Sequence, residues 1–124
     1  MKGLLLDTEE NQIRKVEVNE LHDYYKAMHC DCITVVYTEL EGQQLAIICD
    51  DEALCKSGCL IPTVKLSSGD TIFNSVIFAA IKPGSDDFSD LSEALEDSIF
   101  AESSTFRFRS SYGPTVVGAV CLQV

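Results

Sequence analysis

The stretch Thr71–Ile81, TIFNSVIFAAI, is apolar at most of its positions and carries the strongest information about the fold. A strand with one wet face alternates apolar and polar residues, whereas a strand covered on both faces shows a nearly continuous apolar run. We therefore expect Thr71–Ile81 to form a strand in the centre of a sheet. The turn-forming sequence KPGS, at Lys82–Ser85, then ends the strand.

Four segments before this stretch predict two hairpins. Lys2–Asp7 and Gln12–Val18 flank the polar turn TEEN, and Ile13, Val16 and Val18 lie among polar residues, which favours a half-buried second strand. Cys32–Leu40 is rich in β-branched residues, and the turn Glu41–Gln43 connects it to Gln44–Asp50. Antiparallel pairing within each hairpin is the expected arrangement.

Between the hairpins, the spacing of apolar residues predicts a helix over Glu20–Met28. Asn19 precedes it as a candidate N-cap. The residues expected to face the core follow the spacing i, i+3, i+4, i+7 and are Leu21, Tyr24, Tyr25 and Met28.

The stretch Asp86–Ser104, DDFSDLSEALEDSIFAESS, predicts a second helix and is rich in acids. It holds seven carboxylates, and no Lys or Arg lies between Lys82 and Arg107. We expect the helix to run from Leu91 to about Ala101, with Asp90 and Glu93 as a capping pair and with Leu91, Ala94, Leu95, Ser98 and Ile99 on its inner side. The residues that could bind a partner are Asp86, Asp87, Asp90, Glu93, Glu96 and Asp97. Their exposure has an ordinary explanation as well, because surface helices keep charged residues in water and acids suit a helix start.

The remaining segments complete the predicted fold class. Asp51–Asp70 reads as irregular, and Thr105–Arg109 (TFRFR) and Thr115–Val124 read as strands, the last of them buried. We expect a single α+β domain over residues 1–124, with a mostly antiparallel twisted sheet of about five to seven strands and two main helices. Arg107 and Arg109 would share one side of their strand, where they offset the preceding acids or grip an anion.

Composition limits the classes of partner. The 124 residues carry a formal net charge of −11, which repels phosphate backbones and attracts basic surfaces. We therefore expect no direct nucleic-acid binding and a protein partner with a basic surface. No secretory signal is visible and no apolar run is long enough for a membrane helix. The prediction is a cytoplasmic protein that does not bind membranes and keeps its six cysteines as reduced thiols.

Few residues form a pattern that indicates chemistry. Cys30, Cys32, Cys55 and Cys59 could bind zinc, although Cys-x-Cys is tighter than the usual spacing and buried cysteines often serve as small apolar residues. His29 beside Cys30 is adjacency in sequence alone. Asp50–Glu52 follow a strand, where acids can hold Mg²⁺ but are also common in solvated turns. Phosphate-binding glycine motifs and nucleophile motifs are absent from the sequence. We therefore predict no enzyme, no cofactor and no metal.

Several segments together resemble a known family. The chain from about Lys2 to Phe100 is similar to domain-of-unknown-function family 3846, short proteins of Firmicutes phages and conjugative elements. The resemblance is carried by LLLDTEENQIRKVEVNE, LHDYYKAMHCDCITVVY, LAIICDDEA, SSGDTIFNSVIFAAI and DDFSDLSEALE. It implies an α+β fold and a mobile-element context, and it implies no activity. The family's Gly-Leu-Pro-x-Asn run is replaced here by GCLIPTVKLSSGD, which keeps Pro62 without the Asn, and residues 105–124 extend beyond the similarity.

The functional prediction is a non-enzymatic protein-binding or regulatory module of a mobile element. In its sharper form, the protein is an acidic decoy that inhibits a basic host protein. One alternative is a small zinc- or thiol-dependent module that uses the cysteines. Another is a structural domain that self-associates as a homodimer through the apolar C-terminal strand.

Overall fold

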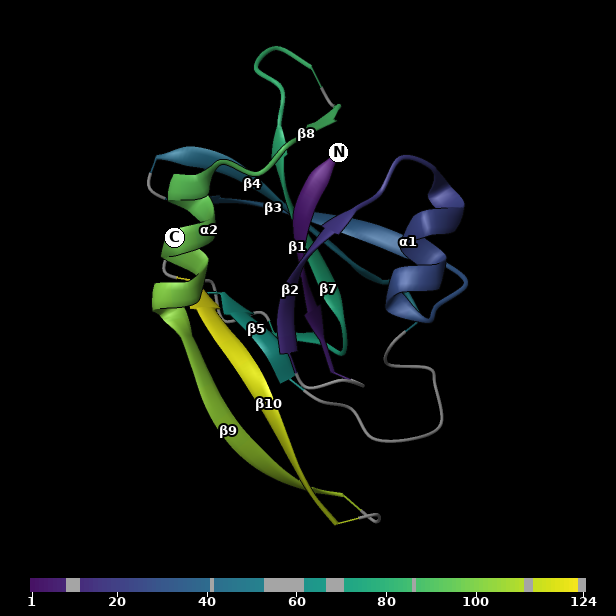
Figure 1. Cartoon of the computed structure of the whole chain (residues 1–124), viewed down its shortest axis with the longest axis vertical. Coiled ribbons are helices and arrows are strands. Elements are labelled where there is room, and N and C mark those ends of the chain that lie inside the picture. The colour runs from purple at the N-terminus through teal and green to yellow at the C-terminus, as the bar shows by residue number, and fades with distance from the viewer. Residues whose placement is uncertain are drawn as a thin grey trace.

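A computed structural model gives the fold and describes residues 1–8, 12–40, 42–52, 62–66, 71–85, 87–110 and 113–122. These residues form ten strands and two helices (Figure 1). In chain order the elements are β1 (Lys2–Asp7), β2 (Gln12–Glu17), α1 (Leu21–Met28), β3 (Ile33–Leu40), β4 (Gln43–Asp50), β5 (Pro62–Leu66), β6 (Thr71–Phe73), β7 (Val76–Ile81), β8 (Phe88–Ser89), α2 (Glu93–Glu102), β9 (Ser103–Ser110) and β10 (Gly113–Leu122).

The first sheet has the strand order β2-β1-β7-β4-β3, and the short strand β8 pairs with the end of β7. Every one of these pairings is antiparallel. Both predicted hairpins, β1–β2 and β3–β4, are confirmed, and β7 lies in the centre as its apolar sequence predicts. A side chain at Gly3 would collide with the backbone carbonyl of Phe78, so glycine permits the close approach of β1 to β7.

The prediction of one strand over Thr71–Ile81 is wrong at Asn74. This residue has a positive φ of 65°, a conformation that Asn tolerates better than most residues, and it separates β6 from β7. Thr63 donates its hydroxyl to the carbonyl oxygens of Asn74 and Ile72, at 2.7 and 3.1 Å, and so holds the turn against β5. Strand β5 itself corrects the expectation that Asp51–Asp70 is irregular, while residues 53–61 and 67–70 lie outside the described part.

The second sheet has the order β6-β5-β10-β9. Strand β10 pairs in parallel with β5 and antiparallel with β9, so the two C-terminal segments are strands, as their sequences predict, and they pair as a hairpin. Figure 1 shows this hairpin extending from the end of α2. The predicted class is confirmed as α+β, mostly antiparallel, with two helices. Its strands are divided between two sheets.

Both faces of the first sheet are covered, which explains its apolar central strands. On one face Leu4, Phe78 and Ile47 pack with α2 and with Val64 and Leu66 of β5. The opposite face packs Leu5, Ile48 and Ile77 against Tyr24 and Met28 of α1. Strand β2 is half-buried as predicted, and it contributes to both faces, because Ile13 contacts the first cluster and Val16 contacts the second.

Helix α1 begins one residue later than predicted. Its N-cap is Glu20, and Asp23 accepts hydrogen bonds from the backbone nitrogens of Asn19 and Glu20, at 2.9 and 3.1 Å. These hydrogen bonds lower the pKa of Asp23. Leu21 is 54% exposed, so the buried stripe consists of Tyr24 and Met28 and does not include all four predicted residues. The described helices are both too short to cross a membrane.

Candidate interaction surface

Helix α2 carries most of the predicted partner-binding residues and is fixed by its apolar side. Leu91 is 6% exposed, and Leu95 and Ile99 are fully buried in the cluster beneath the first sheet. The helix begins at Glu93 and not at Leu91, because the hydroxyl of Ser92 accepts the backbone N–H of Leu95 at 3.2 Å and serves as the N-cap. The predicted capping pair of Asp90 and Glu93 is therefore wrong.

The outer side of α2 presents two exposed carboxylates. Glu93 and Asp97 lie one helical turn apart, and neither has an ion-pair partner among the described residues. We call these two residues the acidic face of α2. Asp87 is exposed in the segment before the helix, and the predicted residue Asp86 lies outside the described part of the chain. Two neighbouring like charges on a docked helix favour contact with a basic group.

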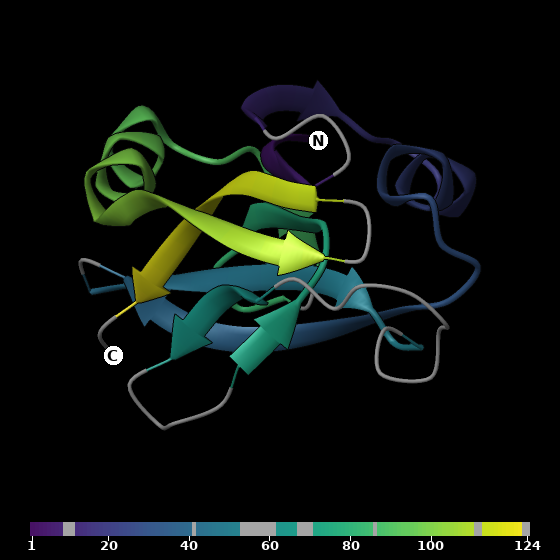
Figure 2. The ribbon, with the colours of Figure 1, turned by 90° about the horizontal axis from the view of Figure 1, so that it is seen from below.

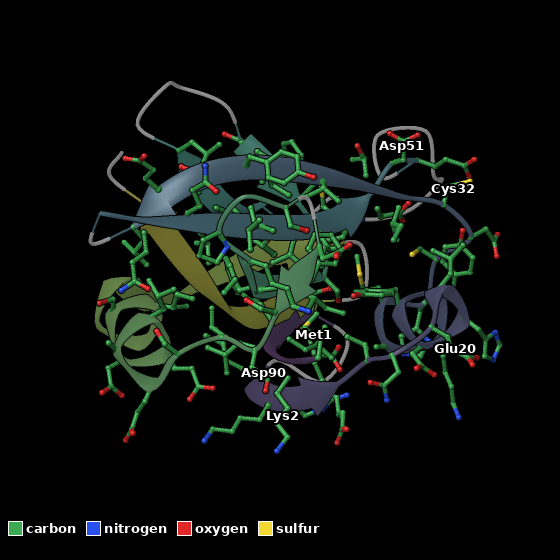
Figure 3. All side chains as sticks on the ribbon, turned by 90° about the horizontal axis from the view of Figure 1, so that it is seen from above. Met1, Lys2, Glu20, Cys32, Asp51 and Asp90 are labelled. Carbon is green, nitrogen blue, oxygen red and sulfur yellow. The ribbon has the colours of Figure 1, made fainter. Side chains whose placement is uncertain are left out.

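Asp90 has a structural contact that its sequence context did not reveal. Its Oδ1 accepts the backbone N–H of Lys2 at 2.8 Å, and the backbone N–H of Leu91 donates to the carbonyl oxygen of Lys2, also at 2.8 Å (Figure 3). These two bonds tie the segment before α2 to the start of β1. Asp90 therefore positions the helix, and we do not include it in the acidic face.

Replacing Asp90 with Ala is expected to lower the free energy of unfolding by about 1 kcal/mol, because a charge-assisted hydrogen bond at an exposed site is lost. Urea unfolding measures the change. Asp87→Ala is the matched control, since the side chain of Asp87 has no described hydrogen bond and its removal should cost almost nothing. Equal losses in the two variants would contradict the assigned role of Asp90.

Glu96 is compensated by a base that is distant in sequence. Its side chain is 13% exposed, and its Oε2 lies 3.4 Å from Nζ of Lys15 on β2. The sequence alone suggested that the acidic stretch has no compensating base. The structure shows that Lys15 supplies one for Glu96. Because the Lys15 side chain is 77% exposed, the pair adds little to stability, but it turns Glu96 away from the acidic face.

One ion pair between a buried acid and a partly exposed base was not predicted from the sequence. Asp7 is 1% exposed and accepts a hydrogen bond from Nη1 of Arg14 at 2.7 Å. The sequence offers a signal for this pair, because Asp7 ends an apolar strand. The register of the predicted hairpin also places Arg14 on the same side of the sheet as Asp7. Beside this pair, a groove of about 390 Å³ runs between β2 and α1. Its lining mixes bases with the acids Glu17 and Asp23, so it favours neither sign of charge.

The described cysteines do not assemble a metal centre. Cys30, Cys32 and Cys49 form no disulfide within the described residues, and Cys55 and Cys59 lie outside them. Within the described ranges, no three His, Cys, Asp or Glu side chains are grouped to hold a metal ion. A hydrogen bond to Glu52 raises the pKa of Cys32, and burial raises the pKa of Cys49 to about 11. Both thiols therefore stay protonated at neutral pH, which disfavours nucleophilic chemistry.

The strand-end acids lie near these thiols. Asp50 accepts the backbone N–H of Glu52 at 2.9 Å, and the backbone N–H of Asp51 donates to the carbonyl oxygen of Cys32 at 3.2 Å (Figure 3). Asp50 and Asp51 also line a small cavity of about 150 Å³ with Cys49. These bonds are typical of a turn that follows a strand, which is an ordinary structural role for Asp50–Glu52.

Alkylation of Cys49 by iodoacetamide at pH 8 is expected to be at least roughly a hundredfold slower in the native protein than in the unfolded chain. A pKa raised from 9.0 to about 11 reduces the thiolate fraction by that factor, and burial slows access further. The native rate should rise about tenfold per pH unit between roughly pH 8 and 10, since the thiolate fraction grows until the pH reaches the pKa. Peptide mapping by mass spectrometry gives the rate at each cysteine, and equal native and unfolded rates would contradict the expectation.

The comparisons with known proteins give one family. Residues 1–103 match the family described as Domain of unknown function (DUF3846). The match ends at the first residue of β9 and leaves β10 outside. No curated protein and no solved structure matches the chain.

Proposed function

The chain belongs to the DUF3846 family, whose description names no activity, and on that premise we propose that it is a non-enzymatic module that binds a protein with a basic surface. The observation that carries the proposal is the arrangement of α2. Buried Leu95 and Ile99 fix the helix, so Glu93 and Asp97 offer two exposed carboxylates in a set position. Charges that are already positioned lose little conformational entropy on binding, which favours affinity.

The charge of the whole chain supports the same class of partner. A net charge of −11 attracts basic surfaces over a distance of about a Debye length and speeds their association. The same field repels the phosphates of nucleic acids, so a nucleic-acid partner is disfavoured. Complementary charge gives specificity and association rate, which suits a regulatory binder.

In its sharper form, the proposal places the protein on a phage or conjugative element and makes its target a basic protein of the host. A groove that holds nucleic-acid phosphates is rich in Lys and Arg, and carboxylates on a stable scaffold fit such a groove by electrostatic complementarity. The protein would then act as a decoy that blocks the target. This role needs no cofactor and no catalytic residue.

Affinity capture at two salt concentrations tests the proposal. Immobilised protein would be exposed to a host lysate at about 50 mM and about 500 mM salt, because exposed ion pairs are screened at the higher concentration. The variant Glu93→Gln/Asp97→Asn removes the acidic face of α2. The control Glu17→Gln/Glu39→Gln removes the same number of exposed carboxylates elsewhere.

We expect the unmodified chain and the control to retain a set of basic proteins at low salt and to release them at high salt. The α2 variant should not retain these proteins. Proteins that stay bound at high salt, or that bind all three chains equally, would refute the electrostatic contact through α2.

A further inference from the structure

The edges of the two sheets are protected unequally. Strand edges attract other strands, and proteins usually prevent this with charged residues, short strands or bulges. At the edges of the described sheets, β2 carries Arg14, Lys15 and Glu17, β9 carries Arg107 and Arg109, and β6 has only three residues. These three edges show the expected protection.

Strand β3 is the exception among the four edges. It runs for eight residues, ITVVYTEL, and all eight pair with β4 in an unbroken register without a bulge. Glu39 is its only charged residue, and five of the eight are β-branched. Figures 2 and 3 show β3 along the border of the first sheet, on the opposite side from β2. The outer side of β3 is therefore a long, regular and nearly uncharged edge.

Tyr37 adds an exposed aromatic side chain to this edge. It is 59% exposed, and with Leu21 it is one of the two large apolar side chains that the described part of the chain leaves in water. Its position on β3 places it beside Val35, two residues earlier on the same face of the sheet, and Val35 is only partly buried. A strand added at this edge would cover both side chains.

We propose that β3 pairs with β3 of a second copy of this chain, antiparallel, about a two-fold axis at Val36. This register places Val35 opposite Tyr37, Thr34 opposite Thr38 and Ile33 opposite Glu39. Aromatic pairs with β-branched residues and Thr pairs both stabilise antiparallel strands, and within Ile33–Glu39 no like charges face one another. The surface is self-complementary, as the interface of a two-fold dimer must be. The first sheets of the two copies then form one continuous sheet.

Charge gives this association a characteristic dependence on salt. Each copy carries −11, so the two copies repel one another at low ionic strength. Added salt screens the repulsion and leaves the backbone pairing and the Tyr37 contact, so the dimer should be favoured at high salt. Binding of a basic partner through α2 has the opposite dependence, and the two proposals can therefore fail separately.

Sedimentation equilibrium on the full chain tests the proposal between about 1 and 500 µM protein, at about 50 and 500 mM salt. The expected result is a mass that rises with concentration from 13.6 kDa towards twice that value, and that rises further at high salt. Tyr37→Glu should hold the mass at 13.6 kDa. Leu21→Glu, the matched control at the other exposed apolar side chain, should leave the dimer intact.

A second variant tests the register. Val35→Lys combined with Tyr37→Glu places opposite charges across the two-fold axis and should restore dimerisation that Tyr37→Glu alone abolishes, with circular dichroism confirming that each variant is folded. A mass of 13.6 kDa for the unmodified chain under every condition would overturn the proposal, and so would a dimer that Leu21→Glu disrupts and Tyr37→Glu does not.

Discussion

Truncation of Phe78 to Ala is expected to lower the free energy of unfolding by about 4 kcal/mol, the largest effect of any single substitution considered for this chain. Phe78 is fully buried in the central strand β7, where it pairs with Leu4 of β1 and with Ile47 of β4. Its loss leaves a cavity between α2 and the middle of the sheet, and strands cannot easily close it without breaking their hydrogen bonds. Urea unfolding followed by circular dichroism measures the change.

Tyr37→Ala serves as the matched control for Phe78→Ala. It removes an aromatic ring of similar size from a strand of the same sheet, but at a position that is 59% exposed. We expect a loss of less than about 1 kcal/mol at low protein concentration, where a dimer does not contribute. Similar losses at the two positions would mean that the central place of β7 is wrong.

Leu95→Ala is expected to cost about 3 kcal/mol and to affect the proposed partner contact as well. Leu95 is fully buried and fastens α2 to the cluster beneath the first sheet. A loosened helix no longer holds Glu93 and Asp97 in a set position. Partner capture at low salt should therefore weaken even at temperatures where the variant remains folded.

Ser98→Ala on the same helix is the control for Leu95→Ala. Ser98 is only partly buried, and Ala is the better helix former, so stability should change by less than about 0.5 kcal/mol. Capture should remain at the level of the unmodified chain. A Leu95→Ala protein that binds as well as Ser98→Ala would show that the position of α2 does not matter for binding.

Local patterns predicted much of the fold. The hairpins β1–β2 and β3–β4 follow from apolar runs separated by short polar turns, since these signals act between neighbours in sequence. The break at Asn74 was not predicted because the apolar segments on either side, Ile72–Phe73 and Val76–Ile81, resemble parts of one continuous strand. Strand β5 was not predicted because its local partner β6 has only three residues and its other partner, β10, lies more than 50 residues later.

The candidate site was likewise predicted where it depends on local patterns and missed where it depends on distant contacts. Helical spacing correctly predicted that Glu93 and Asp97 are exposed and that Leu91, Leu95 and Ile99 are buried. The roles of Asp90 and Glu96 could not be predicted, because their partners Lys2 and Lys15 come from the first hairpin. Contacts between distant segments depend on the strand order of the sheet, which no local pattern specifies.

The position of β10 between β5 and β9 imposes an order on folding. Every strand of the first sheet ends by Ser89, so all of its strands are synthesised before β9 and β10. The parallel pairing of Val64–Leu66 with Val120–Leu122 needs β10, which follows every strand of the first sheet in the chain. A chain emerging from the ribosome could complete the second sheet only after β10 has been synthesised.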